Sequence, residues 1–200
     1  MSYKDVKRSK AEKDTRVIAI INQKGGVGES TTAVNLAAAL GEQNRKVLII
    51  DFDPQGNTTS GFGIDKETLT QCVYDAILHD VPADDIIQDT PCKKVFVVPA
   101  TIQLAGAEIE LVSAIARETR LKDMIEPIRD EFDYIFIDCP PSLGLLTINA
   151  LAAADSVLIP IQCEYYALEG VTKLLESMRM VKGRINKSLD TFGVLLTMYD

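Results

Sequence analysis

The sequence predicts an α/β fold in which a mostly parallel, twisted sheet is covered by helices on both faces. Two observations carry this prediction. Six short runs rich in branched apolar residues alternate with stretches of helical periodicity, as parallel strands joined by crossover helices require. A chain of 200 residues with 46% hydrophobic content can also bury one sizeable core. We therefore expect a single domain over residues 16–200, preceded by a flexible polar tail at residues 1–15.

The expected strands lie at residues 17–21, 46–50, 95–99, 134–138, 156–161 and 191–197. Helical patterns lie at residues 33–40, 69–79, 102–118, 121–131 and 168–183, with Pro127 interrupting the fourth of them. The first helix is expected to end near Gly41, which is a reasonable C′ residue. Because the chain stops three residues after the last strand, which looks central, we expect a C-terminally truncated domain.

Composition argues against several classes of function. The net charge of −8 does not suit a strongly basic nucleic-acid binder, and the small cluster of Lys182, Arg184 and Lys187 is interpreted as a solvated helix end. Four cysteines without C-x-x-C spacing and a single histidine do not make a zinc site, and they suit reduced thiols. Cys139 is expected to be a packed residue, since no histidine is available to activate it. Without a signal peptide or a long apolar run, the protein is expected to be cytoplasmic.

The stretch from Gln23 to Thr32, Gln-Lys-Gly-Gly-Val-Gly-Glu-Ser-Thr-Thr, predicts a phosphate-binding loop between the first strand and the first helix. Its glycines let backbone N–H groups approach an anion, and the start of the following helix adds partial positive charge. The stretch fits the pattern G-x-x-x-x-G-K-[ST] imperfectly. Glu29 occupies the position of the lysine in that pattern, and Lys24 is an additional lysine inside the loop.

Acidic residues follow two of the expected strands. Asp51 and Asp53 come directly after the second strand, and Asp138 ends the fourth. The carboxyl ends of parallel strands meet at the ligand-binding edge of an open sheet, so these carboxylates should lie beside the phosphate loop. Asp138 follows the Walker B pattern, in which a strand-end carboxylate holds Mg²⁺ near the phosphates. An Asx turn before Pro54 is the alternative, structural interpretation of this acidic segment.

Four motifs, in this order, closely resemble the ParA/Soj partitioning ATPases of the deviant Walker A group. They are Lys24-Gly-Gly-Val-Gly, Asp51-Phe-Asp-Pro-Gln-Gly-Asn, Asp138-Cys-Pro-Pro-Ser-Leu-Gly and Ile161-Gln-Cys-Glu-Tyr-Tyr-Ala-Leu-Glu-Gly170. The resemblance implies a P-loop NTPase fold, ATP and Mg²⁺ as cofactors, and an ATP-dependent homodimer. It also implies a nucleoid-associated protein without a membrane partner, whose hydrolysis is stimulated by a ParB/Spo0J-type centromere-binding protein. Non-specific DNA binding is implied through regions expected to lie largely beyond residue 200.

The resemblance implies roles residue by residue. Lys24 would reach across the dimer to the partner's phosphates, and Asp53 would position the attacking water. Mg²⁺ would lie near Ser30, Asp51 and Asp138. The phosphate cradle would consist of Gly25, Gly26, Val27, Gly28, Glu29, Ser30 and Thr31, and the nucleotide-responsive switch would contain Pro140 and Pro141.

Glu29 departs from the family pattern, which has a lysine at this position. At about 4 Å and an effective dielectric constant near 20, one pair of unit charges is worth about 4 kcal/mol. Replacing attraction by repulsion therefore removes several kcal/mol from phosphate binding, and more from a transition state that gathers negative charge. The fold should not suffer, because the backbone cradle survives and the side chain can swing outward. We expect weak ATP binding and negligible hydrolysis.

Other functions remain as alternatives. The main one is a non-hydrolysing P-loop scaffold or binding protein, which ATP turnover after Glu29→Lys would distinguish from an impaired ATPase. A MinD-type membrane-cycling ATPase would need a C-terminal amphipathic helix that this sequence does not show. The nitrogenase iron protein fits poorly, because Cys139 lies in a proline-rich turn without a clear second cysteine ligand.

Overall fold

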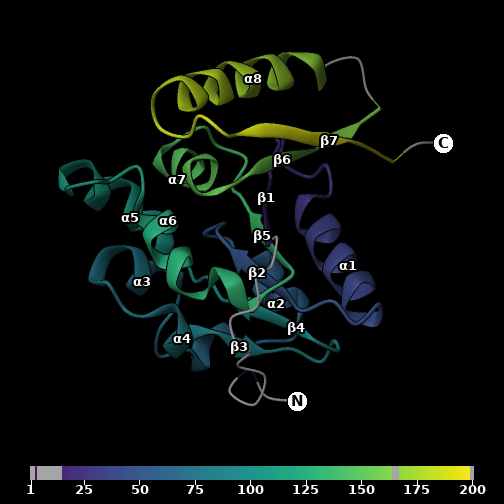
Figure 1. The fold of residues 1–200 in the computed structure, drawn as a ribbon, viewed down its shortest axis with the longest axis vertical. Helices are drawn as coiled ribbons and strands as arrows, with labels where there is room; N and C mark the ends of the chain where they lie inside the picture. Colours follow the sequence, from purple (N-terminus) through teal and green to yellow (C-terminus); the bar gives the residue numbers. More distant parts are fainter. Residues whose placement is uncertain (1–2, 4–14, 164–166, 199–200) are drawn as a thin grey trace.

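The computed structural model describes Tyr3, residues 15–163 and residues 167–198. Within these residues, seven strands form one sheet in the order β3-β4-β2-β5-β1-β6-β7 (Figure 1). They are β1 (Arg16–Ile20), β2 (Val47–Asp51), β3 (Gln88–Asp89), β4 (Val95–Val98), β5 (Tyr134–Asp138), β6 (Ser156–Gln162) and β7 (Asp190–Thr197). Neighbouring strands pair in parallel except β3 with β4. The prediction of a mostly parallel sheet is confirmed.

Helices cover both faces of this sheet, as predicted. They are α1 (Glu29–Glu42), α2 (Asn57–Gly61), α3 (Val73–His79), α4 (Ala83–Ile86), α5 (Leu104–Glu110), α6 (Arg120–Ile125), α7 (Leu145–Ala153) and α8 (Ala167–Arg184), with 3₁₀ turns at Lys66–Thr68, Leu111–Ser113 and Glu126–Glu131. Because side chains alternate along a strand, Ile18 and Ile20 of β1 pack towards α1, whereas Val17 and Ala19 join the core beneath α3 to α7. Figure 1 shows α1 on one side of the sheet, with α5, α6 and α7 on the other.

Several elements differ from the sequence prediction. The helical pattern at 102–118 breaks into α5 and a 3₁₀ turn, and Ile109 and Ile115 are 78% and 89% exposed. Helix α7 was not predicted, because it is buried on nearly all sides and lacks an amphipathic period. The two-residue strand β3 is too short to leave a pattern in the sequence.

The first helix ends near Gly41, as predicted, but Gly41 is not its C′ residue. Helix α1 continues to Glu42, and its C-cap residue is Gln43. A Cβ atom at position 41 would lie 2.2 Å from the carbonyl oxygen of Lys93 and 2.8 Å from Cγ2 of Val95. Glycine is therefore required here for a close approach between the helix and the loop before β4, a contact between residues distant in sequence.

Tyr3 departs from the expected flexible tail. Its side chain is 4% exposed and stacks on Phe132, with ring centroids 6.0 Å apart. The ammonium group of Lys46 lies 5.1 Å from the centre of the Tyr3 ring, and the Tyr3 hydroxyl donates to Asp84 and Glu131. Burial, together with these two carboxylates, raises the pKa of Tyr3 above its usual range. Apart from Thr15, the rest of the predicted tail lies outside the described residues.

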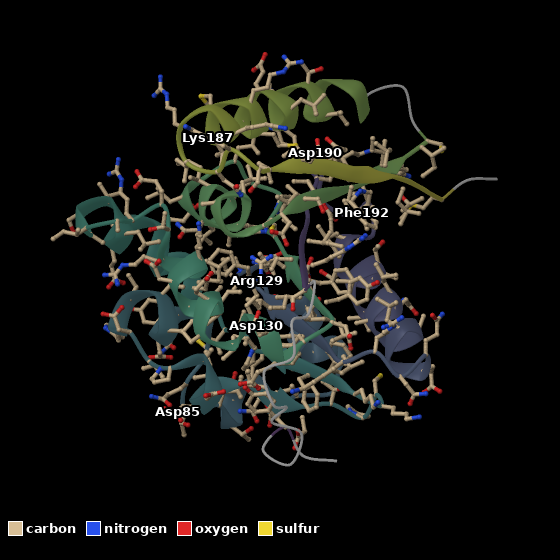
Figure 2. All side chains as sticks on the ribbon, in the orientation of Figure 1. Asp85, Arg129, Asp130, Lys187, Asp190 and Phe192 are labelled. Carbon is tan, nitrogen blue, oxygen red and sulfur yellow. The ribbon has the colours of Figure 1, made fainter. Side chains whose placement is uncertain are left out.

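Strand β7 lies at one edge of the sheet and exposes much of its apolar surface. Phe192, labelled in Figure 2, is 50% exposed, and Val194 and Leu196 on the same strand are also exposed. The basic residues at the end of α8 are exposed, as expected of a solvated helix end, and Lys182 Nζ lies 3.8 Å from Asp190 Oδ1. Among the described helices, none combines the length and the apolar character needed to cross a membrane.

Candidate functional site

The predicted phosphate loop follows β1, near the centre of the sheet. The chain leaves β1 towards β2 on one side, while β6 and β7 lie on the other. Open α/β sheets bind ligands at such a switch point, outside the carboxyl ends of the strands. The register pairs Ile20, the last residue of β1, with Asp138, and pairs Asp138 with Asp51. The loop and both strand-end carboxylates therefore meet at one edge of the sheet.

Two glycines give the loop its shape. Gly26 and Gly28 have φ angles of +79° and +93°, in the left-handed region that favours glycine. Gly28 is the N-cap of α1, so the helix begins at Glu29, four residues before the apolar pattern suggested. The first turn of α1 has backbone N–H groups without intrahelical partners, and it carries partial positive charge. These are the groups that bind phosphate in loops of this kind.

A pocket of about 370 Å³ opens beside the loop. Its lining comes from three segments that are distant in sequence: Gly25, Gly26, Gly28, Glu29, Ser30 and Thr31, then Asp53, Gln55 and Asn57, then Cys139 and Pro141. The predicted cradle residues thus line one cavity, with the exception of Val27, whose side chain is fully buried in the protein. The carbonyl of Val27 accepts a hydrogen bond of 2.9 Å from Thr197 Oγ1 at the end of β7.

Glu29 lines this pocket and is only 8% exposed, so the outward swing that the sequence allowed is not adopted. Its Oε1 atom is buried and has no hydrogen-bond partner. Burial is the main cause that raises the pKa of Glu29 to about 7. A hydrogen bond from its own backbone N–H opposes this shift, and the nearby carboxylates of Asp138 and Asp53 add to it. The side chain thus brings acidic character to the start of α1, at the position of the lysine in the pattern G-x-x-x-x-G-K-[ST].

Asp138 ends β5 at the same edge of the sheet and is fully buried. Its Oδ2 atom accepts a hydrogen bond of 2.6 Å from Thr58 Oγ1, and Ser30 also hydrogen-bonds to this carboxylate. Its Oδ1 atom is buried without a partner. Burial raises the pKa of Asp138 to about 6, against the effect of the hydrogen bonds from Thr58 and Ser30, while Asp53 raises it further.

Asp51 is also fully buried, but its carboxylate is occupied by the chain itself. Oδ2 accepts hydrogen bonds from the backbone N–H and the hydroxyl of Thr59, at 2.7 and 2.6 Å, and Oδ1 accepts one from the N–H of Asp53 at 3.3 Å. Burial raises the pKa of Asp51 to about 7, with a further contribution from Asp138 and against the hydrogen bonds from Thr59 and Asp53. This carboxylate therefore organises the segment between β2 and α2.

Thr58 and Thr59 are functional candidates that sequence reasoning missed. Thr58 holds Asp138, which lies 80 residues further along the chain. The hydroxyl of Thr59 donates to Asp51 and accepts a hydrogen bond of 2.9 Å from the N–H of Ala100. Both threonines are fully buried in the described structure. No local pattern marks them, because their partners become neighbours only when the sheet forms.

Asp53 combines the two interpretations that the sequence left open. Its Oδ1 atom accepts a hydrogen bond of 2.9 Å from the N–H of Gln55, which is the geometry of an Asx turn. The same side chain is half-buried and lines the pocket. The turn and the pocket therefore share one carboxylate.

Lys24 lies on the side of the loop that faces β6. Its ammonium group donates a hydrogen bond of 3.3 Å to Oε1 of Gln162, at the end of β6. Its backbone N–H donates to Oδ1 of Asn22, and the Asn22 amide donates to the carbonyl of Pro160 on the same strand. The structure thus ties the first motif to the start of the fourth, whose residues 164–166 lie outside the described residues. The role of Lys24 across a dimer stays a prediction.

The proline-rich segment after β5 contacts the phosphate loop. A Cβ atom added to Gly25 would lie 3.7 Å from the Cγ atom of Pro141. Cys139, in the same segment, is 2% exposed, and burial raises the pKa of its thiol well above the usual value. Such a thiol stays protonated, so the interpretation of Cys139 as a packed residue agrees with its surroundings.

A parallel α/β sheet with a glycine loop, a helix N-terminus and strand-end carboxylates at its switch point defines a P-loop phosphate-binding protein. The AAA domain family (AAA_31) matches residues 15–191. The sporulation initiation inhibitor protein Soj of Bacillus subtilis is 59% identical over 92% of this chain and 73% of the relative. The chromosome partitioning protein ParA of Myxococcus xanthus is 55% identical over 92% of this chain and 65% of the relative. The chain therefore belongs to the ParA/Soj family of partitioning ATPases.

A solved structure agrees with this assignment of the fold. A Mycobacterium smegmatis protein, described as cobyrinic acid a,c-diamide synthase with bound ADP and magnesium, superposes with a TM-score of 0.89. It is 43% identical, and the match covers 93% of this chain and 76% of that protein. The chain thus spans about two thirds to three quarters of the length of these relatives.

Proposed function

We propose that this chain is a partitioning ATPase of the ParA/Soj type whose nucleotide binding and hydrolysis are impaired by Glu29. In this proposal ATP and Mg²⁺ drive dimerisation and non-specific DNA binding on the nucleoid, and a ParB-type protein stimulates hydrolysis. The relatives at 59% and 55% identity are a Soj and a ParA protein, which supports partitioning over the synthase activity in the description of the 43% identical structure. That structure holds ADP and magnesium, which supports the choice of cofactors.

The pocket fits a magnesium nucleotide at several points. The backbone of Gly25 to Thr31 would surround the phosphates, since the glycines leave the N–H groups accessible. Mg²⁺, when bound, would neutralise phosphate charge. Ser30 and Asp138 would hold it, because the unpartnered Oδ1 of Asp138 is a hard oxygen donor beside the Ser30 hydroxyl. Asp51 would act near the metal mainly by holding the segment that follows β2, since its oxygens already accept hydrogen bonds.

The remaining residues have roles in the same proposal. Asp53 would orient the attacking water, because it is a carboxylate at the pocket wall. Lys24 would leave Gln162 to contact phosphates across the dimer. Pro140 and Pro141 would transmit the nucleotide state, because Pro141 lies against the loop at Gly25.

One observation carries the proposed impairment. The Glu29 side chain stays inside the pocket, where its carboxylate accepts a hydrogen bond from its own backbone N–H. That amide belongs to the group of donors that the loop offers to phosphate. Glu29 therefore opposes phosphate binding in two ways, by repulsion and by occupying a donor. None of the residues that line the described pocket is a lysine or an arginine that could offset this effect.

ATP hydrolysis by Glu29→Lys tests both the impairment and the type of protein. The assay compares wild type, Glu29→Lys and Glu42→Lys, the last being a matched charge change at the exposed end of the same helix. Turnover is expected only in Glu29→Lys, and it should rise with double-stranded DNA and a ParB-type protein. Equal turnover in wild type and Glu29→Lys would contradict the impairment. ATP binding without any turnover in Glu29→Lys would favour the scaffold alternative.

A further inference from the structure

We propose that Thr197 positions the phosphate loop by fixing the peptide unit between Val27 and Gly28. The Thr197 hydroxyl holds the carbonyl of that unit towards β7, so that the N–H of Gly28 faces the phosphate pocket. Thr197 lies outside the four motifs and outside residues 15–191, which the family model matches. This role rests on the proposed nucleotide binding, and it assigns to that binding a residue from the last described strand.

Both branches of the Thr197 side chain lie close to the loop. The hydroxyl donates a hydrogen bond of 2.9 Å to the carbonyl oxygen of Val27, which lies 170 residues earlier in the chain. A Cβ atom added to Gly28 would lie 4.0 Å from Cγ2 of Thr197. Val27 is fully buried, and a buried carbonyl without a donor is costly. The hydroxyl of Thr197 thus satisfies a polar group of the loop that solvent does not reach.

The planar peptide unit links this carbonyl to an N–H group. In a trans peptide, the C=O of Val27 and the N–H of Gly28 lie in one plane and point in opposite directions. The carbonyl points towards β7, which lies on one side of β1, whereas β5 and β2 lie on the other. Asp53 and Pro141, which follow β2 and β5, line the phosphate pocket together with Gly28. The N–H of Gly28 therefore points away from β7 and towards the phosphate pocket.

The local sequence does not determine this orientation, because the second residue of the peptide unit is a glycine. Gly28 has a φ angle of +93°, and glycine populates positive and negative φ about equally. A reversal of the peptide unit would give Gly28 a negative φ at little cost and would turn its N–H away from the pocket. A tertiary contact must therefore select one orientation, and the hydroxyl of Thr197 makes that contact.

The paired ends of β6 and β7 hold the loop at two points. Thr197 pairs with Gln162 in the register of these strands. Oε1 of Gln162 accepts the hydrogen bond of 3.3 Å from Lys24 Nζ, while Thr197 donates to Val27. Because β7 lies at the edge of the sheet beside β6 (Figure 1), the orientation of the phosphate loop depends on the correct pairing of these two strands.

Nuclear magnetic resonance of the nucleotide-free protein tests the orientation directly. Wild type is compared with Thr197→Val, which replaces the hydroxyl by a methyl group, with Thr197→Ser, which keeps the hydroxyl, and with the control Thr191→Val at an exposed position of β7. Thr197→Val should change the carbonyl carbon shift of Val27 and increase the motion of the Gly28 N–H in relaxation measurements, because the peptide unit becomes free to reverse. The other two variants should keep the wild-type values. Unchanged Val27 and Gly28 signals in Thr197→Val would overturn the proposal.

Nucleotide affinity tests the consequence for phosphate binding. Calorimetry with ADP and Mg²⁺ uses a Glu29→Lys background, because wild type is expected to bind nucleotide weakly. A buried hydrogen bond of this kind changes an equilibrium about five- to tenfold, so affinity should fall by about that factor when Thr197→Val is added. Adding Thr197→Ser or Thr191→Val should change affinity by less than about twofold, since both keep the Thr197 hydroxyl or its equivalent. Circular dichroism checks that each variant is folded.

The two measurements separate the role of Thr197 from the proposed function. Equal ADP affinity with and without Thr197→Val would overturn a role for Thr197 in phosphate binding. The same loss in Thr197→Ser as in Thr197→Val would also overturn it, because the hydroxyl would not be the group responsible. If Glu29→Lys itself bound no nucleotide, the proposed function would fail, and the nucleotide-free spectra would still decide whether Thr197 orients the peptide unit.

Discussion

Substitutions at Glu29 should raise ATP affinity in two steps. Glu29→Gln keeps the size of the side chain and removes the negative charge, and Glu29→Lys also adds a positive charge. One pair of unit charges at about 4 Å is worth about 4 kcal/mol at an effective dielectric constant near 20. The pocket is open on one side, so we take half of this value, about 2 kcal/mol, for each step. At 1.4 kcal/mol per factor of ten, affinity should rise about 30-fold in Glu29→Gln and about 1000-fold in Glu29→Lys.

Isothermal titration calorimetry with ATP and saturating Mg²⁺ measures these differences. The titrations belong at pH 8, because the pKa of Glu29 is raised to about 7 and the carboxylate must be ionised for its full effect. Glu42→Gln and Glu42→Lys carry the same charge changes at the far end of α1 and should leave affinity unchanged. Equal affinity in wild type and Glu29→Gln would refute the electrostatic reasoning. It would mean that the Glu29 side chain leaves the pocket when phosphate arrives.

Three further predictions concern stability and reactivity. In urea titrations, Gly41→Ala should lower the free energy of unfolding by about 1–3 kcal/mol or more, because the new Cβ would lie 2.2 Å from a carbonyl oxygen. The control Gly183→Ala in α8 places its Cβ in open space, so it should be neutral or stabilising in the same titrations. Thr59→Val should cost about 1–3 kcal/mol, because a buried carboxylate loses a donor and a backbone N–H loses its acceptor; an unchanged urea midpoint would count against this network. Iodoacetamide should label the exposed Cys163 of the native protein first and spare Cys139, whose thiol is buried with a raised pKa; mass spectrometry showing similar rates would contradict this.

Much of the sheet could be predicted because most of its strands are buried on both faces, although β7 at the edge is exposed along most of its length. Such strands appear in the sequence as continuous apolar runs, and the predicted ranges overlap β1, β2, β4, β5, β6 and β7. Helix α7 was missed for the same reason, since a helix buried on nearly all sides is also a continuous apolar run. The interpretation of residues 102–118 as one helix failed in part, because spacing alone does not show which apolar residues become buried in a core. Ile109 and Ile115 do not become buried.

The candidate site was predictable where its residues are local in sequence. Glycines at 25, 26 and 28 mark the loop, and acids that end strands mark the carboxyl edge. The support for those acids was not predictable. The Thr58 hydroxyl donates a hydrogen bond to Asp138 at the end of β5. The Thr59 hydroxyl donates one to Asp51 and accepts one from the N–H of Ala100. Such contacts depend on strand order, which the periodicity of a single chain does not contain.

The sequence by itself determined the fold class, the family and the unusual acid at position 29. Backbone preferences and burial periods act over a few residues, so they can be read along the chain. Only the tertiary structure decided where the Glu29 side chain lies and which oxygens of Asp138 are satisfied. Burial and charge–charge energies depend on distances between residues from different strands and loops. Those distances are set only when the sheet has assembled. They determine that the Glu29 carboxylate lies at the phosphate pocket, where it opposes the binding of phosphate.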